Sequence, residues 1–220
     1  RFPRLWRASR LLRRWYHARH SAYPDWERLL EQGKDLWEAA QTQTQHGPRV
    51  LLSTAIGSYA HAVTLESALA AALRLRGAEP HVLLCDGELA ACAECDASFY
   101  PRVERFVKHG PSRDLCRDCY WPARRVYERL GVRVHRLSAL VTDDQRQEAT
   151  VVAGSVPFTA IPGYRHDGLA VGEHAHAGAL RFFASGSLDS EPRAEAVLRR
   201  YLKAALVTMF ATRRLAKVQG

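Results

Sequence analysis

Short apolar runs alternate with helical patterns in the middle of the chain. Three runs, at 50–55, 81–85 and 132–135, have the length and apolar content of strands buried in a sheet. An Ala- and Leu-rich stretch at 64–77 has the spacing of a helix, and a second helix is expected over 121–130. This order of strand, helix, strand, helix and strand predicts a Rossmann-like α/β fold with a right-handed parallel βαβαβ sheet.

A further helical pattern precedes this unit. Apolar residues recur at i, i+3, i+4 and i+7 over 24–40, which predicts one helix with a single buried stripe. The polar segment 41–48 ends in a Gly-Pro pair that breaks helices, so it is interpreted as a linker. The sequence therefore predicts a helical arm over 1–46 and a Rossmann-like lobe over 47–220.

Three segments complete the predicted lobe. Residues 86–119 separate the second strand from the second helix and contain four of the five cysteines, so they are expected to form an insertion. Helices are expected over 172–183 and 191–218. The segment 143–153 begins with polar residues, and the apolar run at its end is too short to identify a helix or strand. No element is therefore predicted for it.

The composition excludes several classes of protein. Hydrophobic residues make up 47% and charged residues 25% of the 220 residues, which is typical of a globular protein with a core. A disordered chain, a collagen-like fibre and a disulfide-stabilised miniprotein are thereby excluded. No apolar run reaches the roughly 18 to 20 residues that cross a bilayer. Four cysteines in two close pairs indicate a reducing compartment, so the cytoplasm is the expected location.

The positive charge is concentrated at the beginning of the chain. Residues 1–20 contain seven arginines and no acid, so of the net charge of +9 only +2 belongs to the other 200 residues. This segment is interpreted as a solvated helical arm, as a basic helix that contacts the inner membrane surface peripherally, or as the remnant of a truncated start. Nucleic acid is disfavoured as a partner because the body of the protein is nearly neutral.

Two CxxC pairs form the strongest motif. Cys92 and Cys95 are separated by 20 residues from Cys116 and Cys119. Four thiolates at this spacing are typical of a closed tetrahedral Zn²⁺ site, which predicts a structural zinc ion that holds the insertion together. The alternatives are an iron–sulfur cluster, with Cys85 as a spare ligand, and cysteines that are free of metal or form disulfide bonds. Otherwise Cys85 is expected to be a buried thiol.

The loop after the first strand is the expected functional site. Ligands of open α/β sheets bind outside the carboxyl ends of the strands, where Gly57 and Ser58 would let a ligand approach backbone N–H groups. No GxGxxG is present, which disfavours a dinucleotide. His61 follows, with Glu66 beyond it, and an imidazole can remove a proton from a hydroxyl near neutral pH. The alternative is that His61 is an ordinary histidine at the start of a helix or on the surface.

A second group of polar residues precedes the predicted carboxyl-terminal helices. His174 and His176 would point about 200° apart on a helix and cannot share a metal ion. Glu173 and His176 could share a face, but two ligands leave a metal site incomplete. Structural or surface roles, and a contact from Glu173 and His174 to a substrate, both stay open.

Several short segments of the chain together carry a resemblance to known proteins. They are the run 50–55, GSYAH (57–61), TLES (64–67), RGAE (76–79), VLLCDG (82–87), the two CxxC pairs, GEH (172–174), RF (181–182) and YLKAAL (201–206). Over about 49–215 the chain resembles the amino-terminal half of a bacterial family, the GT-B-type glycosyltransferases of capsule and surface-polysaccharide biosynthesis.

The resemblance implies a two-lobed enzyme that transfers a sugar to an acceptor. In such enzymes the amino-terminal lobe mainly takes the sugar or lipid-linked acceptor, and the carboxyl-terminal lobe binds the nucleotide-sugar donor. A histidine after the first strand is the base in some of these families, and His61 matches it. Because the resemblance implies a second lobe after Gly220, the chain is expected to be either a fragment of such an enzyme or a degenerate relative of the family.

Two functions from other classes stay open beside the glycosyltransferase. One is a zinc-stapled nucleic-acid-binding module that uses the Arg-rich arm, although the cysteine-containing segment has a balanced charge. The other is a non-catalytic partner subunit that pairs with a separate donor-binding chain.

Overall fold

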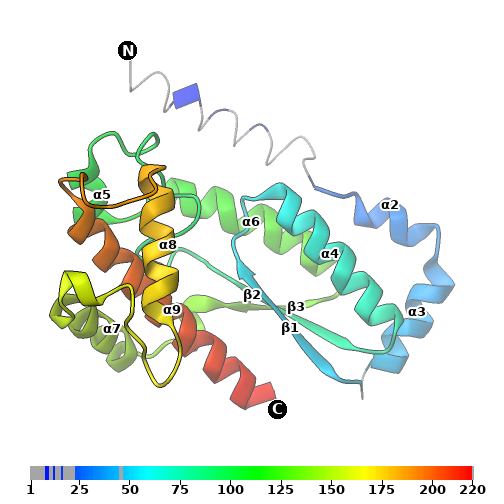
Figure 1. The fold of residues 1–220 in the computed structure, drawn as a ribbon. Helices are drawn as coiled ribbons and strands as arrows, with labels where there is room; N and C mark the ends of the chain where they lie inside the picture. The colour runs from blue at the N-terminus through cyan, green and yellow to red at the C-terminus, as the bar shows by residue number, and fades with distance from the viewer. Residues whose placement is uncertain (1–7, 10–11, 13–15, 17–22, 45–46, 220) are drawn as a thin grey trace. The chain divides into compact units, whose positions relative to one another are not determined.

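The computed structural model of the chain describes residues 8–9, 12, 16, 23–44 and 47–219 (Figure 1). The expectations for the basic segment 1–20, including its contact with a membrane, lie almost entirely outside the described residues.

The chain divides into two compact units, and each is described by itself. The described residues of the first, the sheet unit, fall within 8–86, 114–137 and 215–219. Those of the second, the helical unit, fall within 87–113 and 138–214. The helices before residue 47 therefore belong with the sheet, while most of the segment expected as an insertion belongs with the carboxyl-terminal helices.

The elements, in chain order, are α2 (Trp26–Glu31), α3 (Lys34–Gln43), β1 (Arg49–Ala55), α4 (Ala60–Leu75), β2 (Glu79–Leu84), α5 (Val103–His109), α6 (Arg113–Arg129), β3 (Arg133–Arg136), η2 (Leu137–Leu140), α7 (Asp143–Ser155), η3 (Phe158–Ala160), α8 (Val171–Phe183) and α9 (Ala194–Gln219). None of the described helices has both the length and the apolar composition that are needed to cross a membrane.

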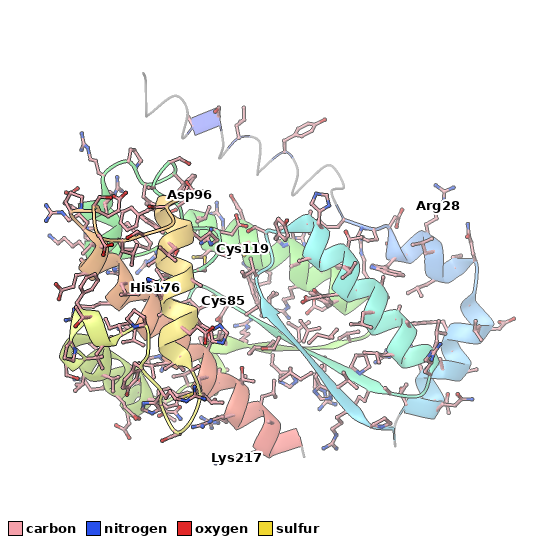
Figure 2. All side chains as sticks on the ribbon, viewed as in Figure 1. Arg28, Cys85, Asp96, Cys119, His176 and Lys217 are labelled. Carbon is pink, nitrogen blue, oxygen red and sulfur yellow. The ribbon has the colours of Figure 1, made fainter. Side chains whose placement is uncertain are left out.

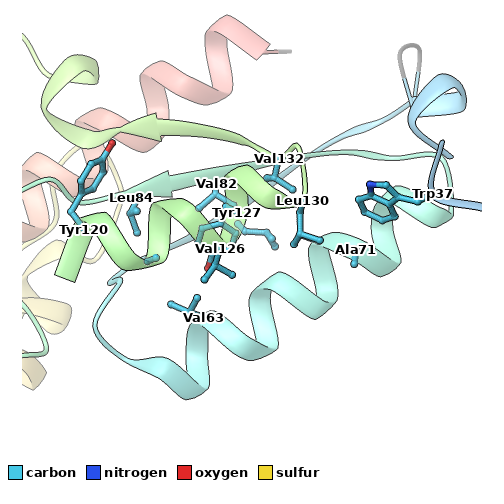
Figure 3. Close-up of a cluster of buried hydrophobic side chains, with 13 residues drawn as sticks. Trp37, Val63, Ala71, Val82, Leu84, Tyr120, Val126, Tyr127, Leu130 and Val132 are labelled. Atoms are coloured by element: carbon cyan, nitrogen blue, oxygen red, sulfur yellow. The ribbon is translucent and has the colours of Figure 1, made fainter. Parts of the chain in front are cut away.

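The three strands form a parallel sheet in the order β1-β2-β3, as the apolar runs predict. Helix α4 connects β1 to β2, and α6 precedes β3 (Figure 1). The mixed α/β class with a small parallel sheet is thereby confirmed. One face of the sheet and these two helices enclose the core of the unit (Figure 3), which consists of Trp37, Leu52, Val63, Ala70, Ala71, Val82, Leu84, Tyr120, Ala123, Val126, Tyr127, Leu130 and Val132.

The helices outside the sheet agree only in part with the predictions. Helices α8 and α9 lie where they are expected. The prediction of one helix over 24–40 is wrong, because the chain forms α2 and α3 with a break at Gly33, whose φ of −127° is not helical. Helix α3 buries Trp37 and Ala40, whereas α2 buries no residue fully, so the expected single buried stripe is interrupted as well.

The face of the sheet opposite the core bears a polar cluster at its amino-terminal edge. Glu79 lies 3.5 Å from Arg49 Nε, 3.7 Å from Arg133 Nη2 and 3.4 Å from His81 Nε2. His81 Nδ1 lies 2.8 Å from His135 Nε2 on the neighbouring strand. Burial lowers the pKa of His81, although the Glu79 carboxylate opposes this, and burial and the nearby His81 lower the pKa of His135. Both imidazoles are therefore neutral in the folded protein near pH 7.

Acidification is expected to destabilise the sheet unit through this histidine pair. Unfolded histidines titrate near pH 6.5, and the folded pKa values lie lower. Below about pH 6.5 the unfolded chain therefore binds more protons, so the free energy of unfolding falls as the pH falls. Urea unfolding at pH 7.5 and pH 5.5 measures this loss, which should be smaller in His135→Gln. The exposed His109 provides the control, since His109→Gln should leave the loss unchanged. An unchanged loss in His135→Gln would contradict the prediction.

Candidate functional site

The candidate site is built at the carboxyl end of β1. Ala55, the last residue of this strand, has a φ of +59°, a left-handed conformation that is costly for a residue with a Cβ. The register of β1 against β2 also shifts between Leu52 and Ala55. Irregularities of this kind end strand pairing and redirect the residues that follow, here the loop 56–59 before α4.

Gly57 lies in close contact with helix α6. A Cβ at this position would be 2.3 Å from the carbonyl oxygen of Cys119 and 2.7 Å from the Cβ of Ala123. The hydroxyl of Tyr23 donates a hydrogen bond of 3.0 Å to the carbonyl oxygen of Gly57. The loop is therefore fixed by a side chain from before α2 and by the backbone of α6, at a distance that only glycine permits.

The backbone N–H groups of this loop have a sulfur atom as acceptor. The amides of Gly57 and Ser58 both donate to Cys119 Sγ, each at 3.2 Å. Cys119 lies in α6, which begins at Arg113, whereas the sequence places Cys119 in an irregular insertion (Figure 2). The two donors that were expected to face a substrate are thus engaged by the protein itself.

The Ser58 hydroxyl is the other polar group of this loop. Its Oγ is buried and has no hydrogen-bond partner among the described residues. An unsatisfied buried hydroxyl costs about 1 to 3 kcal/mol. The hydroxyl is therefore unsatisfied but closed to solvent, and a ligand would reach it only if the loop moved.

His61 and Glu66 lie on different sides of α4. His61 is the second residue of the helix and is exposed, with its ring edge-on to that of Tyr59 at 5.9 Å. Glu66 is half-buried and accepts a hydrogen bond of 2.9 Å from the Tyr127 hydroxyl of α6. Burial raises the pKa of Glu66, and the Tyr127 hydrogen bond partly opposes the shift. Glu66 therefore connects α4 to α6, and His61 is available to a ligand from solvent.

Cys85 follows β2 at the same edge of the sheet (Figure 2). Its backbone N–H donates to the carbonyl oxygen of Ala55 at 3.0 Å. Its side chain is half-buried rather than fully buried as expected, and it forms no disulfide bond.

The first cysteine pair belongs to the helical unit. The Sγ atoms of Cys92 and Cys95 are 3.7 Å apart, and Cys95 is fully buried. Two thiolates on one tetrahedral zinc ion, each with a Zn–S bond of about 2.3 Å, lie about 3.8 Å apart. The hydrogen bond with Cys95, together with burial, raises the pKa of the Cys92 thiol. The separation of the two sulfurs fits two ligands of one metal ion.

Helices α8 and α9 hold the turn between these two cysteines. Arg181 Nη2 donates to the carbonyl oxygens of Cys92 and Cys95 at 2.8 and 3.0 Å. The Tyr201 hydroxyl lies 3.1 and 3.2 Å from the same two oxygens. Burial raises the pKa of Tyr201, so its hydroxyl stays protonated and can donate. The cysteine turn is therefore anchored in the helical unit by polar contacts to its two carbonyl oxygens.

The other predicted site residues are divided between the two units. Cys116 and Cys119 lie three residues apart in α6 of the sheet unit. Glu173 and His174 are exposed in the first turn of α8, in the helical unit. Within the described part of the chain, no group of three or more His, Cys, Asp or Glu side chains is placed to hold a metal ion. Zinc binding therefore stays a prediction.

Sequence reasoning missed the residues that shape the loop. Tyr23 lies 34 residues before Gly57, Cys119 lies 62 residues after it, and no local pattern connects them. The one available signal was the Gly-Ser pair itself, since small residues after a buried strand often mark a close approach of another element.

Comparisons of this chain with protein-family models, with curated proteins and with solved structures found no match.

Proposed function

We propose that this chain is the acceptor-binding, Rossmann-like lobe of a GT-B-type glycosyltransferase in surface-polysaccharide biosynthesis. The observation that carries the proposal is the exposed His61 at the start of α4, directly after the carboxyl end of a parallel strand. Ligands of open α/β sheets bind at this edge, and an imidazole there can reach a bound hydroxyl group. The unsatisfied Ser58 hydroxyl three residues earlier supports the same location.

In this proposal His61 acts as the general base. It accepts the proton of the acceptor hydroxyl while the oxygen forms a bond to the anomeric carbon of the donor sugar. The bond from that carbon to the phosphate oxygen breaks, and the nucleotide leaves with the electron pair.

Assays of nucleotide release and sugar transfer test this function. The product of the complete gene is incubated with UDP-, GDP- and CMP-linked sugars, with and without a lipid-linked saccharide acceptor. We expect one donor class to be hydrolysed slowly and to be consumed faster when acceptor is present. If no class is hydrolysed or transferred, the proposed function is wrong.

We propose in addition that the two CxxC pairs bind zinc in a structural role. The separation of the Cys92 and Cys95 sulfurs fits a zinc-bound pair, and thiolates are the ligands that zinc prefers in closed sites. Two backbone N–H groups donate hydrogen bonds to Cys119 Sγ, and hydrogen bonds of this kind stabilise a metal-bound thiolate. Zinc would supply folding stability rather than chemistry.

Replacing Cys92 by serine is expected to remove zinc and to lower stability together, because the free energy of metal binding contributes to folding. Cys116→Ser should do the same. Zinc content is measured by elemental mass spectrometry, and stability is measured by thermal unfolding with and without a chelator. Cys85→Ser is the control and should keep its zinc. If Cys92→Ser binds as much zinc as the wild type, or unfolds at the same temperature, the structural role is refuted.

A further inference from the structure

We infer that Cys119 is a positioning residue for the candidate site: its sulfur fixes the loop that presents Ser58 and His61. The effect of Cys119 on the loop rests on hydrogen bonds and contacts within the sheet unit. Its consequence for sugar transfer rests on the proposed function.

The hydrogen bonds to the sulfur define the shape of the loop. Consecutive amides, those of Gly57 and Ser58, converge on one acceptor at equal distances of 3.2 Å. The start of α4 has no side-chain cap, since Tyr59 at the N-cap position makes no such hydrogen bond. The entry of the chain into α4 is therefore directed from outside the helix, by an atom of α6.

The packing around Gly57 keeps the sulfur within reach of both amides. The carbonyl oxygen of Cys119 and the Cβ of Ala123 leave no room for a side chain on Gly57, so α6 and the loop are in direct backbone contact. On the other side, the Tyr23 hydroxyl binds the Gly57 carbonyl oxygen. Because His61 follows only four residues after Gly57, a change at Cys119 would displace it together with Ser58.

The sulfur also determines which groups remain for the acceptor. Two converging amides would form a binding site for a phosphate or another anion if their acceptor were absent. Here Cys119 occupies that position, so the exposed His61 imidazole is the group that this segment offers to the acceptor instead. This arrangement fits recognition of a neutral sugar hydroxyl at this loop rather than of a phosphate.

Amide hydrogen exchange of the whole chain tests the inference without an activity assay. In the wild type, the Gly57 and Ser58 amides should exchange more slowly than the first-turn amides of α4, which have no acceptor within the helix. Cys119→Ala should accelerate exchange at these two amides about tenfold or more, because their acceptor is lost. Cys119→Ser should restore part of the protection, since the hydroxyl oxygen can accept the same bonds.

Cys116→Ala would remove the proposed zinc ion but leaves Cys119 Sγ in place, so both amides should stay more protected in Cys116→Ala than in Cys119→Ala. Cys85→Ala, which removes a sulfur at the end of the neighbouring strand, should change neither rate. If Cys116→Ala accelerates both amides as much as Cys119→Ala does, the protection comes from the metal site and the inference is wrong.

Two other outcomes would also overturn the inference. One is fast exchange of both amides in the wild type, which decides the question even if Cys119→Ala fails to fold. The other is unchanged protection in Cys119→Ala. The proposed function fails separately: if the exchange rates behave as expected but no donor is hydrolysed or transferred, Cys119 positions the loop and the loop serves another purpose.

Discussion

Replacement of His61 by alanine is expected to lower the kcat of sugar transfer by about 10²- to 10⁴-fold, the usual effect of removing a general base. The acceptor hydroxyl would then have no group to take its proton as the new bond forms. Because His61 is exposed in the first turn of α4, the free energy of unfolding should change by less than about 0.5 kcal/mol. Steady-state kinetics with saturating donor, together with thermal unfolding, measure the two effects.

Two further variants separate proton transfer from simple contact. His61→Gln keeps a polar side chain of similar length but cannot accept a proton near pH 7, so we expect it to be as slow as His61→Ala. His109→Ala removes another exposed histidine, at the end of α5, and should keep full activity. If His61→Gln retains more than about a tenth of the wild-type kcat, His61 binds the acceptor but is not the base.

The parallel sheet could be predicted because its signal is local. Strand β2 is buried over nearly its whole length, and the run 81–85 shows the apolar residues that such burial requires. Strand β1 is only partly buried, with Ser53 exposed, so the expectation of a strand buried on both faces is wrong for the run 50–55. Helices α8 and α9 could be predicted equally well, since each repeats apolar residues with the helical period. A strand or helix whose buried residues lie within one continuous segment can therefore be predicted from the sequence alone.

Helix α7 was missed although the sequence contains a signal for its start. The Thr142 hydroxyl accepts from the Gln145 backbone N–H, and the Gln145 side chain accepts from the Thr142 N–H, which is a complete capping box. Thr-x-x-Gln before a helix is recognisable in a sequence. The helix buries only Ala149 and Ala153, so a search for large apolar residues could not find it.

The arrangement around Cys119 was not predictable for a different reason. Helix α6 repeats its buried residues with the helical period, as Leu115, Tyr120 and Ala123 show. The cysteine pair in its first turns was interpreted as part of an insertion, so the helix was expected to begin only at residue 121. The CxxC pattern indicates metal ligands but gives no information about which backbone amides approach the sulfur. That contact depends on how β1, its loop and α6 pack, and the residues that make it are more than sixty positions apart.

Gly57→Ala is expected to lower the free energy of unfolding of the sheet unit by about 1 to 3 kcal/mol or more, as overpacking does in well-packed interiors. The new Cβ would lie 2.3 Å from the Cys119 carbonyl oxygen, which belongs to the backbone and cannot rotate away. The loop or α6 must therefore move, and the Gly57 and Ser58 amides should lose their bonds to Cys119 Sγ. Urea unfolding and amide exchange measure the two consequences.

Two other glycines show whether the cost at Gly57 comes from packing. Gly77 has a φ of +83° and open space around its Cα, so Gly77→Ala introduces backbone strain without a clash and should cost about 1 to 2 kcal/mol. Gly154 lies in α7, and a Cβ there meets nothing within 4 Å, so Gly154→Ala should stabilise the protein by up to about 1 kcal/mol. Gly57 has no positive φ, so its cost must come from the contact with α6. If Gly57→Ala is as stable as the wild type and keeps both amides protected, α6 does not restrain the loop, and Cys119 cannot position the site.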